Sequence, residues 1–314
     1  MGSAFSPLFG VFECIGNGKS GVASCFTRDS YTMSVGLAIS WIIFTTIASI
    51  ITRNYSWVDR SWSIFPVVIS WIAVLYSKNG WSLPTTVSPA LLMTLVITLW
   101  GLRLSYNFYR KGGYSKGGED YRWTYVRSWP IMQNPIVWGL FFVFFINIYQ
   151  LALIWSFTVP VLQLPAYKPA CLASYFFAGL FLVFLAIESI ADQQQWDFHQ
   201  AKFKKVPCPP ELTADCKRGF LTHGLWSWSR HPNVFGEVMM WVVVFLSSIP
   251  HVGLTTSFLG AVLLIALIIP SARLTETISS PKYPQYKNYQ RTTPFLFPTG
   301  TDTRLLIDRT LKDE

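Results

Sequence analysis

A stretch of fourteen residues holds most of the side chains that could do chemistry in this chain. Residues 224–237 read Gly-Leu-Trp-Ser-Trp-Ser-Arg-His-Pro-Asn-Val-Phe-Gly-Glu, and an apolar run over 238–249 follows directly. Polar groups at the mouth of a membrane helix are costly to keep there and indicate a functional site. Pro232 suits the first turn of that helix because its φ is fixed and it lacks an N–H. Arg230, His231 and the helix N-terminus would then face one place, as an anion-binding site requires.

A basic juxtamembrane anchor with interfacial tryptophans is the alternative interpretation. An anchor would need neither Asn233 nor Glu237. Other charged residues lie toward the same predicted membrane face, within or beside other apolar stretches: Asp59, Arg60, Arg103, Glu188, Asp192, Arg273 and Glu276. They could form one polar chamber under an apolar, aromatic roof, or they could be separate snorkelling charges and helix-packing ion pairs.

Long apolar stretches must position these groups. Hydrophobic residues make up 51% of the 314 residues and charged residues only 13%, whereas soluble domains carry roughly 25% charged residues. A transmembrane helix needs about 20 mostly apolar residues. Seven stretches come close: 34–52, 62–78, 88–108, 136–157, 173–192, 233–250 and 254–271. The chain is therefore predicted to be an all-α, multi-pass integral membrane protein with about seven transmembrane helices.

Lysine and arginine are distributed unequally between the two faces of this arrangement. Four lie on one side and twenty on the other, in the loops 53–61, 109–135 and 193–232 and the tail from 272. The positive-inside rule makes the richer side cytosolic and leaves the N-terminus outside or in a lumen. Because no linker or repeat is visible, one membrane domain is predicted over 34–298, between a non-cytosolic segment 1–33 and a cytosolic tail 299–314.

The net charge and the cysteines indicate which binding partners and which metal or disulfide sites to expect. The net charge of +9 favours a basic membrane face, and since no nucleic-acid-binding motif is present, no nucleic-acid partner is predicted. The five cysteines do not make a disulfide framework, although Cys14 and Cys25 could pair if the N-terminus faces an oxidising compartment. Cys208 and Cys216 lie in a loop predicted to be cytosolic. No cysteine has metal-ligand spacing with a histidine, so no metal site is predicted.

The loop over 109–135 is patterned. It contains Gly112-Gly113, Gly117-Gly118 and the run Glu119-Asp-Tyr-Arg-Trp123. Glycines, acids and an arginine in this order could cover a phosphate, since successive backbone N–H groups form anion-binding concavities. The loop could equally be a solvated connection.

The chain also resembles a known group of membrane enzymes. Arg230-His-Pro-Asn233 with Gly236-Glu237, followed by a Tyr-Pro-x-Tyr-x-x-Tyr run over 283–289, is similar to the C-terminal signature of the steroid 5α-reductase-like superfamily. The chain looks most like its less characterised branch, whose VDRxWS, EDYRW, ADQ and GLWxxSRHPN segments read here at 58–63, 119–123, 191–193 and 224–233. The resemblance covers roughly residues 35–298.

This resemblance implies an NADPH site, because sterol reductases of the superfamily bind NADPH at the matching pattern. The implied cofactor-binding residues are Asp192, Gln195, Lys202, Trp226, Arg230, His231, Asn233, Glu237, Arg273 and Tyr286. Steroid 5α-reductases polarise the substrate carbonyl with a glutamate and a tyrosine. By order along the chain, Asp59 and Tyr106 fall nearest to these two positions, although Trp100 occupies the more natural place for the tyrosine.

The expected function is NADPH-dependent reduction of a lipidic enone or other activated C=C bond of a steroid, sterol or polyprenoid. The substrate would enter from the bilayer, and the active site would face the cytosol, in the endoplasmic reticulum if the source is eukaryotic. Isoprenylcysteine carboxyl methyltransferases, which carry a very similar Arg-His-Pro stretch and bind S-adenosylmethionine there, provide the alternative. Asn233 and Glu237 favour the reductase over this lipid methyltransferase.

Overall fold

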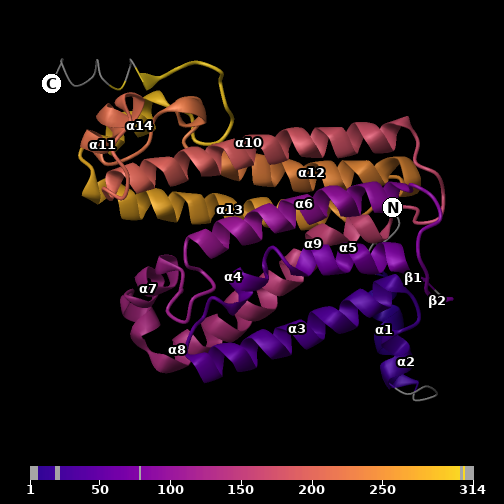
Figure 1. Ribbon diagram of the computed structural model, residues 1–314. Coiled ribbons are helices and arrows are strands. Elements are labelled where there is room, and N and C mark those ends of the chain that lie inside the picture. The colour runs from indigo at the N-terminus through magenta and orange to yellow at the C-terminus, as the bar shows by residue number, and fades with distance from the viewer. Residues whose placement is uncertain (1–5, 18–21, 78, 305–306, 308–314) are drawn as a thin grey trace. The chain divides into compact units, whose positions relative to one another are not determined.

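The computed structural model describes residues 6–17, 22–77, 79–304 and 307, and helices dominate it (Figure 1). Within the described residues, seven helical segments are long and apolar enough to cross a membrane. They are Ser30–Thr52, Trp57–Leu75, Pro89–Arg110, Pro135–Leu162, Leu172–Lys202, Pro232–Val252 and Phe258–Lys282. The prediction of an all-α, multi-pass membrane protein is confirmed. The orientation of the termini stays a prediction.

The chain forms two compact units. Unit 1 comprises residues 1–181 and 241–264, and unit 2 comprises residues 182–240 and 265–314. Three helices, α10 (Leu172–Lys202), α12 (Pro232–Val252) and α13 (Phe258–Ser279), contribute residues to both units. The assignment of 34–298 to one membrane domain, with flanking segments 1–33 and 299–314, stays a prediction.

Unit 1 contains most of the helices and the short β1–β2 hairpin. Besides parts of α10, α12 and α13, its elements are α1 (Ser6–Gly16), α2 (Val22–Phe26), α3 (Ser30–Thr52), α4 (Trp57–Ser61), α5 (Phe65–Leu75), β1 (Tyr76–Ser77), β2 (Gly80–Trp81), α6 (Pro89–Arg110), α7 (Tyr121–Arg127), η1 (Pro130–Gln133), α8 (Pro135–Leu140), η2 (Phe141–Tyr149) and α9 (Gln150–Leu162). Helix α5 packs against α6 and α9.

Aromatic rings and small residues hold the centre of unit 1. The buried ring of Trp241 lies edge-on to Trp100, with centroids 5.1 Å apart, and 4.2 Å from Phe157. A Cβ at Gly101 would lie 2.7 Å from the carbonyl oxygen of Ser63. Apolar burial does little to drive helices together within lipid, so close packing at small residues carries the association of membrane helices. Gly101 supplies that close approach between α6 and the chain preceding α5.

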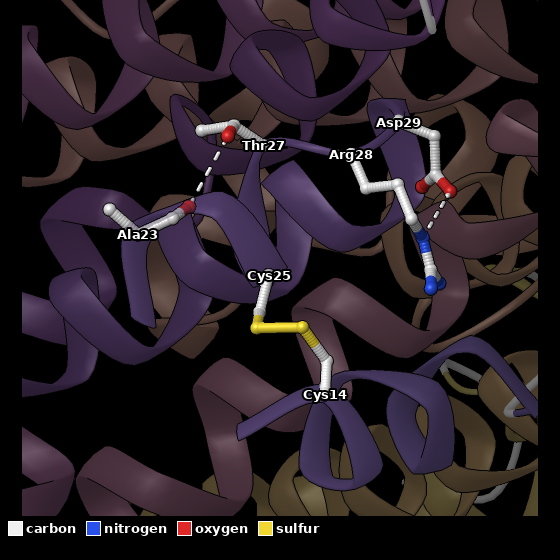
Figure 2. Close-up of a disulfide and its surroundings, with 6 residues drawn as sticks. All are labelled: Cys14, Ala23, Cys25, Thr27, Arg28 and Asp29. Carbon is white, nitrogen blue, oxygen red and sulfur yellow. Dashed lines mark hydrogen bonds and ion pairs between the residues drawn. A yellow bond between two sulfur atoms is a disulfide. The ribbon is translucent and has the colours of Figure 1, made fainter. Parts of the chain in front are cut away.

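The N-terminal helices are tied together covalently. A disulfide joins Cys14 of α1 to Cys25 of α2, the pairing that the sequence allowed (Figure 2). Asp29 then begins α3 with a capping box: its carboxylate accepts the Thr32 N–H at 2.8 Å, and the Thr32 hydroxyl accepts the Asp29 N–H at 3.1 Å. These reciprocal bonds satisfy two orphan donors of the helix start. They set the start of α3 before the apolar run begins.

Two spans contain features that the apolar pattern did not predict. Helix α10 continues past residue 192 to Lys202, where side-chain bonds at helical spacing, such as Gln193 Nε2 to Asp197 Oδ1 at 2.8 Å, support polar turns. The fourth span contains the π-helical segment η2, in which Asn147 Nδ2 donates to the Phe142 carbonyl at 3.1 Å. The pattern of apolar residues predicts the membrane-crossing stretch, but it predicts neither the polar last turns of α10 nor the π-helical segment.

Unit 2 combines the ends of three long helices with short elements. These short elements are η3 (Pro210–Leu212), α11 (Thr213–Arg218), η4 (Gly224–Ser227), η5 (Ser280–Lys282) and α14 (Tyr286–Thr292). Phe220, Tyr286, Tyr289 and Ile307 form one buried cluster. Gly219 ends α11 at φ 87°, and a Cβ there would meet the Tyr283 ring at 2.6 Å. A glycine is therefore required both for the left-handed turn and for the close contact.

Candidate functional site

The stretch 224–237 is fastened to its neighbours in unit 2 mainly through backbone groups. Gln194 of α10 accepts the Leu225 N–H at 3.1 Å, and the Trp226 indole N–H donates to the Ala191 carbonyl at 3.1 Å. From α14, the buried Tyr289 hydroxyl donates to the Trp226 carbonyl at 2.6 Å. Trp226 thus anchors the stretch against α10, which gives it a positioning role in the structure.

Arg230 and Glu276 form the centre of the site. Arg230 Nε and Nη2 donate to the two oxygens of the Glu276 carboxylate at 2.7 and 3.3 Å. Its Nη1 donates to the carbonyls of Gln290 and Thr293 at 2.8 and 2.6 Å. These contacts use four of the five N–H groups of a guanidinium. Arg230 therefore joins the segment before α12 to α13 and to the end of α14, and it keeps little capacity for a ligand.

Glu276 collects further donors on the same carboxylate. His231 Nε2 lies 2.9 Å from its Oε1, and Gln290 Nε2 donates to its Oε2 at 2.8 Å. Because an ionised carboxylate only accepts, the proton of this contact belongs on His231 Nε2. With the two bonds from Arg230, four donors meet one buried carboxylate, about the number of lone pairs that it offers. The charges of this buried group are satisfied internally.

A cavity of about 410 Å³ opens beside this group. It is lined by Arg230, Arg273, Glu276, Thr277, Ser280, Gln290 and Phe295. The exposed Arg273 guanidinium lies 5.7 Å from the Phe295 ring centroid and makes no hydrogen bond or ion pair with a residue that the structure describes. Unlike Arg230, Arg273 has its N–H donors available. A planar guanidinium beside two hydroxyls suits a phosphate group.

Asn233 lies in the first turn of α12 and faces α10. Its Nδ2 is 3.4 Å from Asp192 Oδ1, while its buried Oδ1 has no hydrogen-bond partner among the described residues. At Gly236 a Cβ would lie 2.8 Å from the Glu188 Cβ, so α10 and α12 approach closely here. The adjacent Glu237 is buried as well. An unpartnered buried acceptor is costly, and it suits a ligand that carries an N–H or O–H donor.

Three other residues implied by the resemblance have partners away from this cavity. Lys202 Nζ donates to the Gly219 carbonyl at 2.6 Å and to the Tyr283 hydroxyl at 2.5 Å. Tyr286 is buried with its ring 5.1 Å from Phe220, and Gln195 Nε2 lies 2.8 Å from His199 Nε2. None of the three lines the cavity. Their part in cofactor binding stays a prediction.

Asp59 lies in unit 1, in a polar cluster that the loop over 109–135 completes. The Trp123 indole N–H donates to Asp59 Oδ2 at 2.9 Å. Asp120 accepts the backbone N–H, Nε and Nη2 of Arg122 at 2.9, 2.9 and 2.6 Å. Burial raises the pKa of Asp120, but the hydrogen bonds and charge of Arg122 lower it by more, so that the pKa lies below its ordinary value. Trp123 thus holds the carboxylate of Asp59, and Arg122 holds that of Asp120.

The glycine-rich part of this loop packs on the start of the second span. Arg60 donates from Nε and Nη2 to the carbonyls of Gly113, Ser115 and Gly118 at 3.2, 2.9 and 3.2 Å. The Ser56 hydroxyl accepts the Asp120 N–H at 2.9 Å. These bonds make the loop an ordered part of unit 1.

Tyr106, the second predicted catalytic residue, lies elsewhere on unit 1. Its ring is 61% exposed, and the Arg110 guanidinium lies 5.5 Å from the ring centroid. No hydrogen bond joins it to Asp59 in the described part of the chain. The Asp59 carboxylate instead accepts a hydrogen bond from Trp123, 64 residues along the chain.

Sequence reasoning assigned no role to four residues that the structure brings to the cavity: Thr277, Ser280, Gln290 and Phe295. Glu276 carries a weak signal, since it follows Arg273 by three residues on one helix and was expected within a polar chamber. The partners of Arg230 are 46 to 63 residues away in the sequence. Only folding brings them together. The predicted chamber that would join these residues with Asp59 and Arg103 stays a prediction.

These features define an integral, multi-pass membrane protein with polar clusters in both units. The chain belongs to the family described as "Protein of unknown function (DUF1295)", whose model matches residues 44–293, and this family lies within the steroid 5α-reductase-like superfamily. An uncharacterized protein of Schizosaccharomyces pombe is 35% identical over 277 residues, which cover 84% of this chain and 79% of that relative. No solved structure matches the chain.

Proposed function

We propose that this protein is an NADPH-dependent membrane reductase of a lipidic enone or another activated C=C bond. The observation that carries the proposal is the cavity beside Arg230, where Arg273 holds an uncommitted guanidinium. Volumes of about 300–1,000 Å³ are usual for ligand sites, and this cavity falls within that range. The resemblance of the chain to NADPH-binding sterol reductases agrees with an anionic ligand at this place.

Some of these residues would contact NADPH directly, and others would hold the contacting residues in place. Arg273, with the hydroxyls of Thr277 and Ser280, would hold a phosphate. The free Oδ1 of Asn233 would accept a donor such as the carboxamide or adenine amine. Arg230 and His231 would act by holding Glu276 and the cavity wall. NADPH, when bound, supplies the hydride.

The second part of the proposal concerns the proton. By its motif position, Asp59 would hydrogen-bond the substrate carbonyl and stabilise the developing enolate. The Trp123 indole N–H holds Oδ2 of Asp59 in place, which orients the carboxyl group for this purpose. Preorganised groups of this kind commonly make the largest catalytic contribution. A steroid, sterol or polyprenoid substrate would enter from the bilayer, with the site facing the cytosol, in the endoplasmic reticulum if the source is eukaryotic.

The second candidate function is that of an S-adenosylmethionine-dependent lipid methyltransferase. Isoprenylcysteine carboxyl methyltransferases carry a similar Arg-His-Pro stretch. The sulfonium cation of S-adenosylmethionine would favour a carboxylate with lone pairs to spare. Glu276, the carboxylate at this cavity, already receives four hydrogen bonds. The charge arrangement therefore favours the reductase.

Thermal stabilisation of the purified protein by NADPH, NADH and S-adenosylmethionine tests this proposal. A ligand at 100 times its dissociation constant stabilises by about 2.7 kcal/mol, so NADPH should raise the melting temperature. Arg273→Gln should weaken NADPH binding roughly tenfold or more, the loss expected for one charge-assisted hydrogen bond. Arg291→Gln, at an exposed arginine of α14, is the matched control.

Asp59→Asn should keep NADPH binding and lose turnover with a defined enone. Stabilisation by S-adenosylmethionine alone would replace the reductase with the methyltransferase. If the Arg273 variant and its control bound NADPH equally well, the assignment of Arg273 to a phosphate of NADPH would be rejected. Unchanged turnover of the Asp59 variant would reject its catalytic role.

A further inference from the structure

A second cavity lies wholly within unit 1 and shares no lining residue with the proposed NADPH site. Its volume is about 340 Å³, within the usual range of roughly 300–1,000 Å³ for ligand sites. The residues that line it include Tyr55, Glu119, Trp123, Arg127, Ser128 and Trp138. Most belong to the patterned loop over 109–135 and to α7. In Figure 1, α4, α7 and α8, which flank these residues in the chain, gather at one end of unit 1.

Two donors at this cavity have no acceptor. The exposed Arg127 guanidinium lies over the rings of Tyr55 and Trp138, 5.8 and 5.2 Å from their centroids, and makes no hydrogen bond or ion pair with a described residue. The indole nitrogen of Trp138 is buried without a partner, and this residue is only 4% exposed. Buried N–H groups are rarely left unsatisfied. Together the two donors point to a ligand with anionic oxygen atoms.

The cavity also carries a negative charge. Glu119 Oε1 accepts the Tyr55 N–H at 2.8 Å, which fixes the carboxylate at the cavity wall. Trp123 contributes its ring, because its own N–H is committed to Asp59. With Arg127 and Glu119 as the only charged side chains that line the cavity in the described chain, the lining is neutral overall. A ligand with one phosphate and one ammonium matches this pair better than a dianion.

The position of the cavity along the spans indicates the depth of its ligand. Trp138 lies in the first turns of the span Pro135–Leu162, and Tyr55 lies two residues before the span Trp57–Leu75. Nearby apolar side chains are exposed: Trp129 by 40%, Ile131 by 65% and Ile136 by 72%. Aromatic residues gather at the level of lipid head groups. The cavity therefore lies where a hydrocarbon core gives way to the interface.

We propose that this cavity binds a phosphate diester that carries an ammonium group, the chemistry of a zwitterionic phospholipid head. The phosphate lies against the Arg127 guanidinium and the Trp138 N–H, and the ammonium lies against Glu119. The same chemistry occurs in soluble glycerophosphodiesters, so the source is a separate question. The site is independent of the proposed NADPH site, because its residues differ entirely.

Native mass spectrometry of the full chain in detergent, after delipidation, measures this binding. The ligands are phosphatidylethanolamine, the anionic phosphatidylglycerol and soluble glycerophosphoethanolamine. The wild-type protein should bind phosphatidylethanolamine more tightly than phosphatidylglycerol. Arg127→Gln should weaken phosphatidylethanolamine binding roughly tenfold, and Trp138→Phe, which keeps a ring and removes only the N–H, should weaken it roughly threefold.

Glu119→Gln should reduce or reverse the preference over phosphatidylglycerol. Arg291→Gln and Trp81→Phe, at an exposed arginine and an exposed tryptophan of other elements, are the matched controls and should bind like the wild type. The melting temperature of each variant without lipid verifies its fold. Trp138→Phe and Arg127→Gln address the same ligand from two elements, so the test does not depend on either variant alone.

Comparable binding of glycerophosphoethanolamine would support the assigned chemistry and identify a soluble ester as the source, whereas binding of the lipid alone would identify the membrane. If the wild type and the Glu119→Gln variant each bound the two lipids equally, the proposed recognition of an ammonium group by Glu119 would be overturned. Unchanged binding by the folded Arg127 and Trp138 variants would overturn the site.

Discussion

Two arginines, one in each unit, show two different uses of a cation. In unit 2, Arg230 donates four hydrogen bonds, to Glu276 and to two backbone carbonyls. In unit 1, Arg127 lies over two aromatic rings and makes no hydrogen bond or ion pair with a described residue. The first arginine is consumed in holding unit 2 together. The second remains available to a ligand.

Membership of a motif therefore does not identify the side chain that binds a ligand. Arg230 stands in the most patterned part of the sequence, yet its donors are nearly exhausted. Arg273 and Arg127 stand in less specific surroundings, yet their donors are free of described partners. The number of hydrogen bonds already made separates a structural cation from a binding one.

Removing the charge of Glu276 should have the largest effect. Glu276→Gln leaves Arg230 and His231 buried without their carboxylate, and breaking a buried ion pair costs about 3–5 kcal/mol. A large fall in the melting temperature in detergent is expected, with unit 2 becoming sensitive to limited proteolysis. Glu211→Gln, at an exposed glutamate of the same unit, should melt like the wild type. Similar melting of both variants would show that the Arg230 group does not hold unit 2.

Acidification should act on unit 1 through Asp120. Its pKa in the folded state lies below its ordinary value of 3.8, because the hydrogen bonds and charge of Arg122 outweigh the effect of burial. A lowered folded-state pKa contributes stability that is present above about pH 4 and is lost as the pH falls through the folded value. Hydrogen exchange of residues 111–127 should therefore accelerate below about pH 4.

Asp120→Asn should remove that acid dependence and destabilise unit 1 by on the order of 1–2 kcal/mol, since the pair is partly exposed. Asp302 and Arg304 repeat the same pattern of bonds at the same spacing, but both side chains are 41% exposed. Asp302→Asn is thus a matched control, and it should change the melting temperature little. An equal effect of the two substitutions would refute the role of burial.

Arg127→Gln should have the smallest effect on stability. Surface substitutions usually change the free energy of unfolding by less than about 0.5 kcal/mol, and Arg127 makes only ring contacts. Arg230→Gln, by contrast, should lower the melting temperature strongly. If Arg127→Gln destabilised the lipid-free protein as much, Arg127 would belong with the structural cations and the comparison would fail.

The architecture could be predicted from local properties of the sequence. The seven spans were predicted because apolar runs of about 20 residues are needed wherever a helix crosses a membrane, and the structure confirms them. The pairing of Cys14 with Cys25, expected if the N-terminus faces an oxidising compartment, is present in the structure. Boundaries were less accurate at α10, because its last turns are supported by polar side-chain bonds that hydropathy does not register.

Composition and short-range spacing were sufficient to predict the helical membrane class, the approximate spans and the stretches with a capacity for chemistry. Which polar groups are already hydrogen-bonded could be read only from the folded chain. Arg230 meets Glu276 across 46 residues, and Asp59 meets Trp123 across 64. A hydrogen bond depends on distances of about 3 Å between its atoms, and only the folded chain sets such distances between residues so far apart.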